Sequence, residues 1–346
     1  MRARVGVGAP GRRTLLGVLC VVSALLSPPV AGASSEAGAD PCAGLETIVL
    51  PSGQVTCTHG ADPLESLTRR HHPSGADDPE HSDGDLLPVE PESGPPTTAP
   101  DRVPCFGDGR DGNRIQAIYA VPSDREDRYW DTVDSIRRWA AETDSVFAST
   151  ALRLGATRHV RFVTDSRCQL VVDRVVLSPA ADDNFRATVA ELAALGYHRP
   201  DRRYLVWMDS DVLCGIGQLH RDERTTGNLN DGVGAGLVAR VDTRCWGLLE
   251  LMGTSVEAHE LVHTLGGVNL SAPHATPLGH CTDDGDLMCY QDAPVTRVSE
   301  VCPPEGNAFL DCNGDDYFNP RPPAGSYLDT HWNVADSSFL SPATGS

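Results

Sequence analysis

The chain has 346 residues, 40% of them hydrophobic, and a formal net charge of −20. This apolar content is enough for one large folded domain or two modest ones. Nucleic acid is excluded as a natural partner, because binding to phosphate backbones requires a basic surface.

The first residues have the pattern of an export signal. Several arginines precede a short apolar run from Leu15 to Leu26, and the small residues Ala31 to Ala33 follow as a cleavage site. The run is short for a bilayer, and no later stretch is apolar enough to span one. We therefore predict a signal peptide over residues 1–33, a secreted extracellular protein and no membrane span.

The cysteines indicate structural disulfides. Of the 11 cysteines, Cys20 lies in the apolar run and is lost with the signal peptide, which leaves an even set in an oxidising compartment. Sequence does not determine the connectivity. The pairs that we favour are Cys42–Cys57, Cys105–Cys168, Cys214–Cys245, Cys281–Cys289 and Cys302–Cys312.

Composition divides the rest of the chain into three regions. Residues 34–57 form a small segment that a disulfide clips into a strand, turn and strand. Residues 58–104 are rich in Pro, Asp, Glu and Ser and bury too little apolar surface to offset chain entropy, so we predict a disordered linker. Residues 105–346 have the texture of one folded domain.

Strands and helices are mixed along this domain. Hydrophobic periodicity predicts strands at 114–121, 159–164, 170–177, 203–209 and 236–242, and helices at 127–154, around 185–195 and from Thr254. The stretch 236–242 is our candidate for the edge of the sheet. The order of elements indicates an α+β domain with two lobes, a helix along the floor of the cleft between them, and a loop-rich, disulfide-bonded C-terminal lobe.

The helix from Thr254 carries the motif "HELVH". His259 and His263 are four residues apart, so both imidazoles project from one helix face and can reach one metal ion. Glu260 would lie beside a water activated by the ion and take its proton. A capping pair, Thr254 with Glu257, supports the start of the helix. The alternative is a solvent-exposed face of an ordinary helix, which these features make the weaker interpretation.

These residues resemble the metzincin metallopeptidases, whose pattern is HExxHxxGxxH followed by a turn containing methionine. His259, Glu260, His263 and Gly266 match the pattern, and Met288 in "DLMCY" resembles the methionine beneath the metal. The resemblance implies a metzincin-like fold, a catalytic zinc ion and a protein or peptide substrate. The sequences of the stretch "APHATPLGHCTD" and of the C-terminal tail are also similar to those of a group of secreted bacterial proteins.

In some metzincins a tyrosine two residues after the methionine reaches the metal or the transition state, and Tyr290 occupies the matching position. The chain departs from the pattern at Asn269, which replaces the third histidine. An amide oxygen is a poor zinc ligand beside imidazole. We predict that His280 is the third ligand, because Gly279 lets the backbone turn back towards the helix. The alternative is His274, although prolines on both sides make its stretch stiff. Weaker candidates are Asp283, Asp284 and Asp286.

The sequence thus predicts a secreted zinc-dependent endopeptidase. In this prediction the ligands are His259, His263 and His280, Glu260 is the general base, and Tyr290 stabilises the oxyanion. The alternative function is a non-catalytic binding module that retains the scaffold, although such a module has no need of Glu260. The segment "DCNGDD" (311–316) places oxygen side chains at alternating positions, so Ca²⁺ is a second candidate metal beside a simple acidic turn.

Overall fold

The computed structural model describes residues 40–64, 66, 102–302 and 309–341. The predicted signal peptide and most of the predicted linker lie outside these residues. Across the part of the chain that is described, none of the helices has the length and hydropathy needed to cross a membrane.

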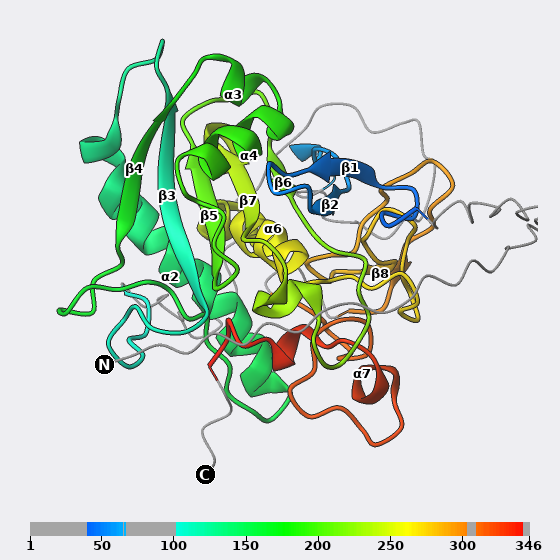
Figure 1. Ribbon diagram of the computed structural model, residues 1–346. Helices are drawn as coiled ribbons and strands as arrows, with labels where there is room; N and C mark the ends of the chain where they lie inside the picture. Colours follow the sequence, from blue (N-terminus) through cyan, green and yellow to red (C-terminus); the bar gives the residue numbers. More distant parts are fainter. Residues whose placement is uncertain (1–39, 65, 67–101, 303–308, 342–346) are drawn as a thin grey trace, which may run out of the picture. The chain divides into compact units, whose positions relative to one another are not determined.

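The described elements are short except for one long helix (Figure 1). The strands are β1 (Glu46–Val49), β2 (Val55–Thr58), β3 (Arg114–Pro122), β4 (Val172–Leu177), β5 (Arg202–Met208), β6 (Gly215–Gly217), β7 (Leu237–Asp242), β8 (Asp283–Asp284) and β9 (Ser299–Glu300). The helices are α2 (Tyr129–Arg153), α3 (Ala180–Asp183), α4 (Phe185–Ala194), α5 (Leu249–Met252), α6 (Val256–Thr264) and α7 (Tyr327–Thr330). Single helical turns occur at η1 (Leu229–Val233), η2 (Thr243–Cys245) and η4 (Val334–Asp336).

A five-stranded sheet with the order β4-β3-β5-β7-β6 forms the centre of the domain. Its first four strands are parallel, and β6 pairs antiparallel with β7 at the edge. The prediction that residues 236–242 form the edge is wrong, because β7 lies between β5 and β6. The true edge, Gly215–Gly217, has three residues and two glycines, so it has no hydrophobic alternation to detect.

Helices cover both faces of the sheet. Alternate residues of β3 point to opposite sides: Ile115 and Ala117 join the core that includes α2 and α6, whereas Ile118 and Ala120 join the core that includes α4. Parallel strands buried on both faces read as continuous apolar runs, and β5 is buried at every position. The mixed sheet and its helices agree with the predicted α+β class. The predicted strand at 159–164 forms only isolated bridges.

Helix α6 runs beneath the edge of the sheet and is buried at all of its residues. It begins one residue later than predicted: Ser255 is the N-cap, and its hydroxyl accepts a hydrogen bond from the Ala258 amide at 3.2 Å. The Glu257 carboxylate instead accepts from the Gly247 amide at 2.8 Å. Gly266, with φ of 90°, follows the helix and lets the chain turn away from it.

All five predicted disulfides are confirmed: Cys42–Cys57, Cys105–Cys168, Cys214–Cys245, Cys281–Cys289 and Cys302–Cys312. The first closes the β1–β2 hairpin. The third joins Cys214, which precedes β6, to Cys245, which follows β7. The last two cross-link the loops that follow α6, where regular structure is sparse. Such cross-links compensate for a small local core and are typical of oxidising compartments.

Glu142 of α2 gives the fold a pH dependence. Its side chain is 2% exposed, and its nearest cation is Arg138, with 3.7 Å between Nε and the carboxylate. Burial and the negative charges of Glu250 and Glu257 raise the pKa of Glu142 to about 7, against the opposing effect of Arg138. The folded state therefore holds this proton more tightly than the unfolded chain does.

We predict that Glu142→Gln stabilises the protein at pH 8 and has little effect at pH 4.5. A raised folded-state pKa contributes stability below the unfolded pKa, and that contribution is lost as the pH rises through about 7. The expected gain at pH 8 is on the order of 1 kcal/mol in the free energy of unfolding. Denaturant unfolding at both pH values measures it, with the exposed Glu126→Gln as the control. Equal effects at the two pH values would contradict the assignment.

Candidate metal centre

Two histidines of α6 present one ring nitrogen each to the same interior space. His259 and His263 are fully buried, and their ring centroids are 5.0 Å apart. Nδ1 of His259 lies 2.9 Å from the Leu287 carbonyl oxygen, and Nδ1 of His263 lies 3.0 Å from that of Gly267. Because a carbonyl only accepts hydrogen bonds, both Nδ1 atoms carry the proton and both Nε2 atoms keep a lone pair for a ligand.

His280 joins these two histidines from the loop beyond the helix. Its ring centroid lies 5.4 Å from that of His259 and 5.1 Å from that of His263. Its Nδ1 is 3.3 Å from an Asp292 carboxylate oxygen, and its Nε2 is 3.2 Å from the Tyr290 hydroxyl and 3.6 Å from Oδ1 of Asp62. Gly279 has φ of 93°, a conformation that glycine adopts readily, and the chain turns here as the sequence suggested. The three predicted ligands therefore lie together.

The other two candidates for the third position lie elsewhere. Nδ1 of His274 is 3.1 Å from Asp316 and 3.2 Å from Asp283, in a separate group of side chains. The Asn269 amide nitrogen donates to the Trp332 carbonyl at 2.9 Å, which ties the loop after α6 to the C-terminal segment. The structure thus gives Asn269 a structural contact and sets His274 apart.

The donor atoms at α6 fit a zinc ion. Among the described residues, Nε2 of His263 and both Glu260 carboxylate oxygens are buried without a hydrogen-bond partner, while Nε2 of His259 and Oδ2 of Asp62 lie 2.9 Å apart as an ion pair. Unpaired buried polar atoms are costly, and so many in one place call for a bound cation. The donor atoms of His59, Asp62, His263 and His280 lie within 4.8 Å of one another, and so do those of Asp62, His259 and Glu260. Imidazole and carboxylate groups are both donors that zinc accepts.

Electrostatics favours the neutral, metal-binding form of two of the rings. Burial lowers the pKa of His280 to about 4, and burial together with the neighbouring His59 and His259 holds the pKa of His263 well below its ordinary value. Burial also opposes the charge of His259, but Asp62 outweighs it and raises the pKa of that ring. The position between His259 and Asp62 therefore attracts a positive charge, whether a proton or a metal ion.

Glu260 lies under the edge strand, and β6 is glycine-rich because of it. A Cβ atom at Gly215 would stand 2.1 Å from a Glu260 carboxylate oxygen, and one at Gly217 would stand 2.8 Å from Cβ of His263. Only glycine permits so close an approach of strand and helix. Burial and the charge of Asp62 raise the pKa of Glu260 to about 7, against the opposing effects of His59 and His259.

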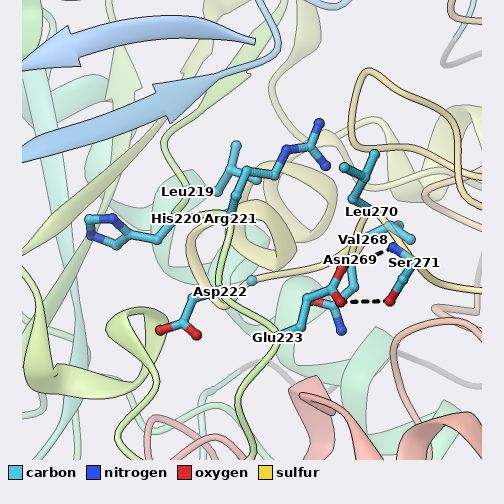
Figure 2. A pocket seen from close by; sticks show the side chains of 10 residues that line it. Leu219, His220, Arg221, Asp222, Glu223, Val268, Asn269, Leu270 and Ser271 are labelled. Atoms are coloured by element: carbon cyan, nitrogen blue, oxygen red, sulfur yellow. Dashed lines mark hydrogen bonds between the residues drawn. The ribbon is translucent and has the colours of Figure 1, made fainter. Parts of the chain in front are cut away.

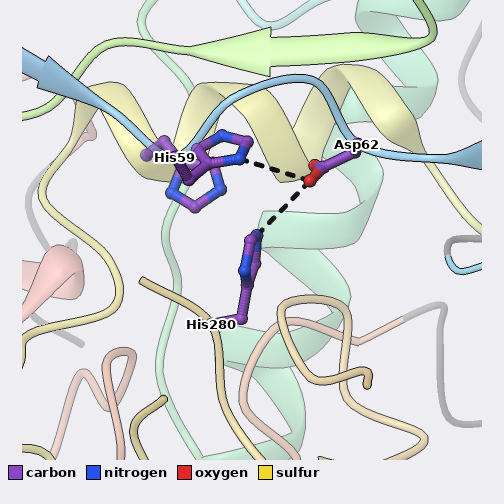
Figure 3. Close-up of side chains that lie close together, drawn as sticks. His59, Asp62 and His280 are labelled. Atoms are coloured by element: carbon purple, nitrogen blue, oxygen red, sulfur yellow. Dashed lines mark ion pairs between the residues drawn. The ribbon is translucent and has the colours of Figure 1, made fainter. Parts of the chain in front are cut away.

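Sequence reasoning missed two residues of this centre, His59 and Asp62. Both side chains are almost fully buried, and Oδ2 of Asp62 is 2.9 Å from Nε2 of His259. In Figure 3 the dashed lines from His59 and from His280 meet at the carboxylate of Asp62; Oδ1 of Asp62 is 3.2 Å from Nδ1 of His59 and 3.6 Å from Nε2 of His280. The predicted linker therefore begins too early at Thr58, because residues 58–64 belong to the folded domain.

Met288 lies in the loop that Cys281–Cys289 closes, and Tyr290 directly follows this loop. The Tyr290 hydroxyl donates to Asp62 and lies 3.2 Å from Nε2 of His280. Burial raises the pKa of this hydroxyl, so it remains a hydrogen-bond donor. Met288 is fully buried, and its carbonyl accepts from the Cys281 amide at 3.1 Å, which ties this loop to the residue after His280.

A second group of potential ligands contains His274, Asp283, Asp315 and Asp316, whose donor atoms lie within 4.8 Å of one another. It includes part of the "DCNGDD" segment for which Ca²⁺ was the candidate. Asp311 of that segment faces the backbone instead, and accepts hydrogen bonds from the amides of residues 314–318. For Asp311 this supports the interpretation as an acidic turn, and Ca²⁺ binding stays a prediction.

A pocket of about 350 Å³ lies beyond β6, where the chain leaves the edge of the sheet (Figure 2). The segment Leu219–Glu223 forms one side, and the loop after α6, including Val268–Ser271, forms the other. The Glu223 carboxylate joins the two sides, because it accepts from the Ser271 amide at 2.9 Å and from its hydroxyl at 2.6 Å. The pocket therefore lies between the segment that follows β6 and the loop that follows α6.

No protein-family model matches the chain, and no curated protein matches it either.

Proposed function

We propose that the protein is a secreted zinc-dependent endopeptidase of metzincin-like fold. The observation that carries this proposal is the convergence of His259, His263 and His280, each with Nδ1 held by another group. Glu260 adjoins them with two carboxylate oxygens that accept no hydrogen bond. The five disulfides agree with secretion, since such bonds persist in oxidising compartments.

The reaction proposed is hydrolysis of a peptide bond. Zinc bound to the three histidines would polarise a carbonyl and lower the pKa of water. Glu260, whose pKa is raised to about 7, can accept a proton from the attacking water and deliver it to the departing amine. The protonated Tyr290 hydroxyl can donate to the oxygen on which negative charge develops.

The substrate proposed is an extended peptide paired with the edge strand β6. Peptides bind to edge strands by adding a strand, and the Asp62 amide pairs with this edge in that way, donating to the Gly215 carbonyl at 3.0 Å. Residues 236–242, the edge predicted from the sequence, cannot serve in this way because they lie inside the sheet. The edge is the strand that passes directly over Glu260 and His263, so a peptide paired with it would bring its carbonyls near both residues.

We predict that His280→Ala weakens zinc binding by at least about 100-fold, whereas His274→Ala and Asn269→Ala leave it nearly unchanged. Losing one of three imidazole ligands removes a large part of the affinity, and the other two side chains contact different partners. Competition with a chelator of known affinity measures the effect. The assignment fails if His280→Ala holds zinc as tightly as the parent while either of the others releases it.

We also predict that Glu260→Gln retains about one zinc ion per chain and loses hydrolysis of casein by a factor of about 10² to 10⁴, because an amide cannot accept the proton from water. Metal content and casein hydrolysis are measured with and without chelator, in the parent and in Glu260→Gln. Glu257→Gln, on the same helix but bonded to Gly247, is the control for burial of a carboxylate in α6. Undiminished turnover by Glu260→Gln would rule out Glu260 as the base.

A further inference from the structure

We propose that Asp292 is a positioning residue of the candidate metal centre. In this proposal its carboxylate holds the His280 ring in the orientation that directs Nε2 at the metal, and its negative charge strengthens that ring as a donor. The inference rests on the zinc centre of the proposed function and deepens it, because it assigns a role to a residue outside the proposed set of metal ligands.

His280 has less support from regular structure than the other two proposed ligands. His259 and His263 lie on α6, whose backbone fixes their spacing. His280 lies on a loop, outside the helices and strands of the described residues. A ring in such a place can rotate about its side-chain bonds unless a partner holds its other nitrogen. The orientation of the His280 ring therefore depends on side-chain contacts.

Asp292 provides the contact that the His280 ring needs. Its Oδ2 lies 3.3 Å from Nδ1 of His280, and the two side chains are only 3% and 2% exposed. An ionised carboxylate can only accept hydrogen bonds, so Nδ1 of His280 carries the proton. Nε2 of the same ring then keeps its lone pair for a metal.

Two threonine hydroxyls fix the Asp292 carboxylate. Thr296 donates to Oδ1 at 2.6 Å, and Thr276 donates to Oδ2. Thr276 also binds the main chain of His280: its amide donates to the His280 carbonyl at 2.8 Å, and its hydroxyl accepts from the His280 amide at 3.2 Å. The ring and the backbone of His280 are therefore both connected to one carboxylate.

The charge of Asp292 distinguishes His280 from the other two rings. Nδ1 of His259 and Nδ1 of His263 face neutral backbone carbonyls, whereas Nδ1 of His280 faces a carboxylate. A hydrogen bond to an ionised acceptor is stronger than one to a neutral acceptor, and it raises the basicity of the imidazole towards a metal. We infer that this charge compensates for a third ligand that comes from a loop.

The alternative is that Asp292 only stabilises the loop, and the chain offers a matched control for this. Asp316 is also buried, its Oδ2 is 3.1 Å from Nδ1 of His274, and its Oδ1 accepts from the His274 amide at 2.9 Å. This second pair of aspartate and histidine lies outside the candidate metal centre. Asp316→Asn therefore removes a comparable buried charge without contact to the proposed ligands.

The test compares the parent with Asp292→Asn, Asp292→Ala, Thr296→Val and the control Asp316→Asn, all as full chains. Asparagine keeps the shape and an acceptor oxygen but lacks the charge, alanine removes both, and Thr296→Val removes one donor to the carboxylate. Four quantities are measured: zinc affinity by competition with a chelator, the visible absorption of the cobalt-substituted protein, thermal unfolding of the metal-free protein, and hydrolysis of casein.

We expect Asp292→Asn to weaken zinc binding about 10-fold and Asp292→Ala about 100-fold. Both variants should shift the cobalt absorption, because the ligand field depends on the basicity and the orientation of the imidazole. Thr296→Val should show a smaller loss of affinity in the same direction, and it serves as the second variant if the Asp292 variants fail to fold. Asp316→Asn should keep the affinity and the spectrum of the parent.

The inference is overturned if the Asp292 variants bind zinc as tightly as the parent, or if Asp316→Asn weakens zinc binding as much as Asp292→Asn does. A lower unfolding temperature with an unchanged cobalt spectrum would show a structural role alone and overturns it as well. If Thr296→Val is the only variant that folds, an affinity equal to that of the parent has the same consequence.

The measurements also separate this inference from the proposed function. If affinity and spectrum change as expected but no form hydrolyses any substrate in a broad peptide library, the inference stands and the peptidase function fails. If casein is hydrolysed and the Asp292 variants match the parent in affinity and spectrum, the peptidase function stands and the inference fails. If the parent binds neither zinc nor cobalt, both fail.

Discussion

The structure depends on the concentration of ionisable groups around the middle of α6. Asp62, Glu260 and four imidazoles meet there, almost fully shielded from water. Burying charge is tolerable only when opposite charges and hydrogen bonds compensate for it. The local architecture supplies part of this compensation, because backbone carbonyls fix the ring protons and glycines in β6 leave room for the carboxylate. The proposed zinc ion would complete the balance.

The loop-rich C-terminal region positions several groups of the candidate metal centre. It contributes little regular structure, yet it supplies the carbonyl of Leu287, the carboxylate of Asp292 and His280 itself. Irregular backbone leaves carbonyl groups available to accept a hydrogen bond from a ring nitrogen. Most carbonyl groups inside strands and helices are already paired with backbone amides. Such loops need another source of rigidity, and Cys281–Cys289 provides it next to His280. The disulfides are therefore part of how the centre is positioned.

The sequence could predict those features that depend on residues close to one another along the chain. The four-residue spacing of His259 and His263 follows from helical geometry, and His280 could be chosen because Gly279 permits the turn that brings it back. The disulfide pairs are mostly close in sequence. His59 and Asp62 could not be assigned to the centre from the sequence, because about 200 residues separate them from the helix that they contact. They also border an acidic, proline-rich stretch, whose composition led to the prediction of a linker. The signal available was "CTHGAD", a histidine and an aspartate directly after a disulfide-clipped strand.

The buried charges of the centre bear on the choice between an enzyme and a binding module. A scaffold that only binds a partner would gain stability from filling the space under β6 with an apolar side chain, since burying a carboxylate is costly even when it is paired. The chain instead keeps Glu260, keeps the glycine whose Cβ would clash with it, and places His59 3.6 Å from it. The proposed peptidase needs Glu260 as its base, whereas a binding module does not, so these features support the proposed peptidase over the binding module.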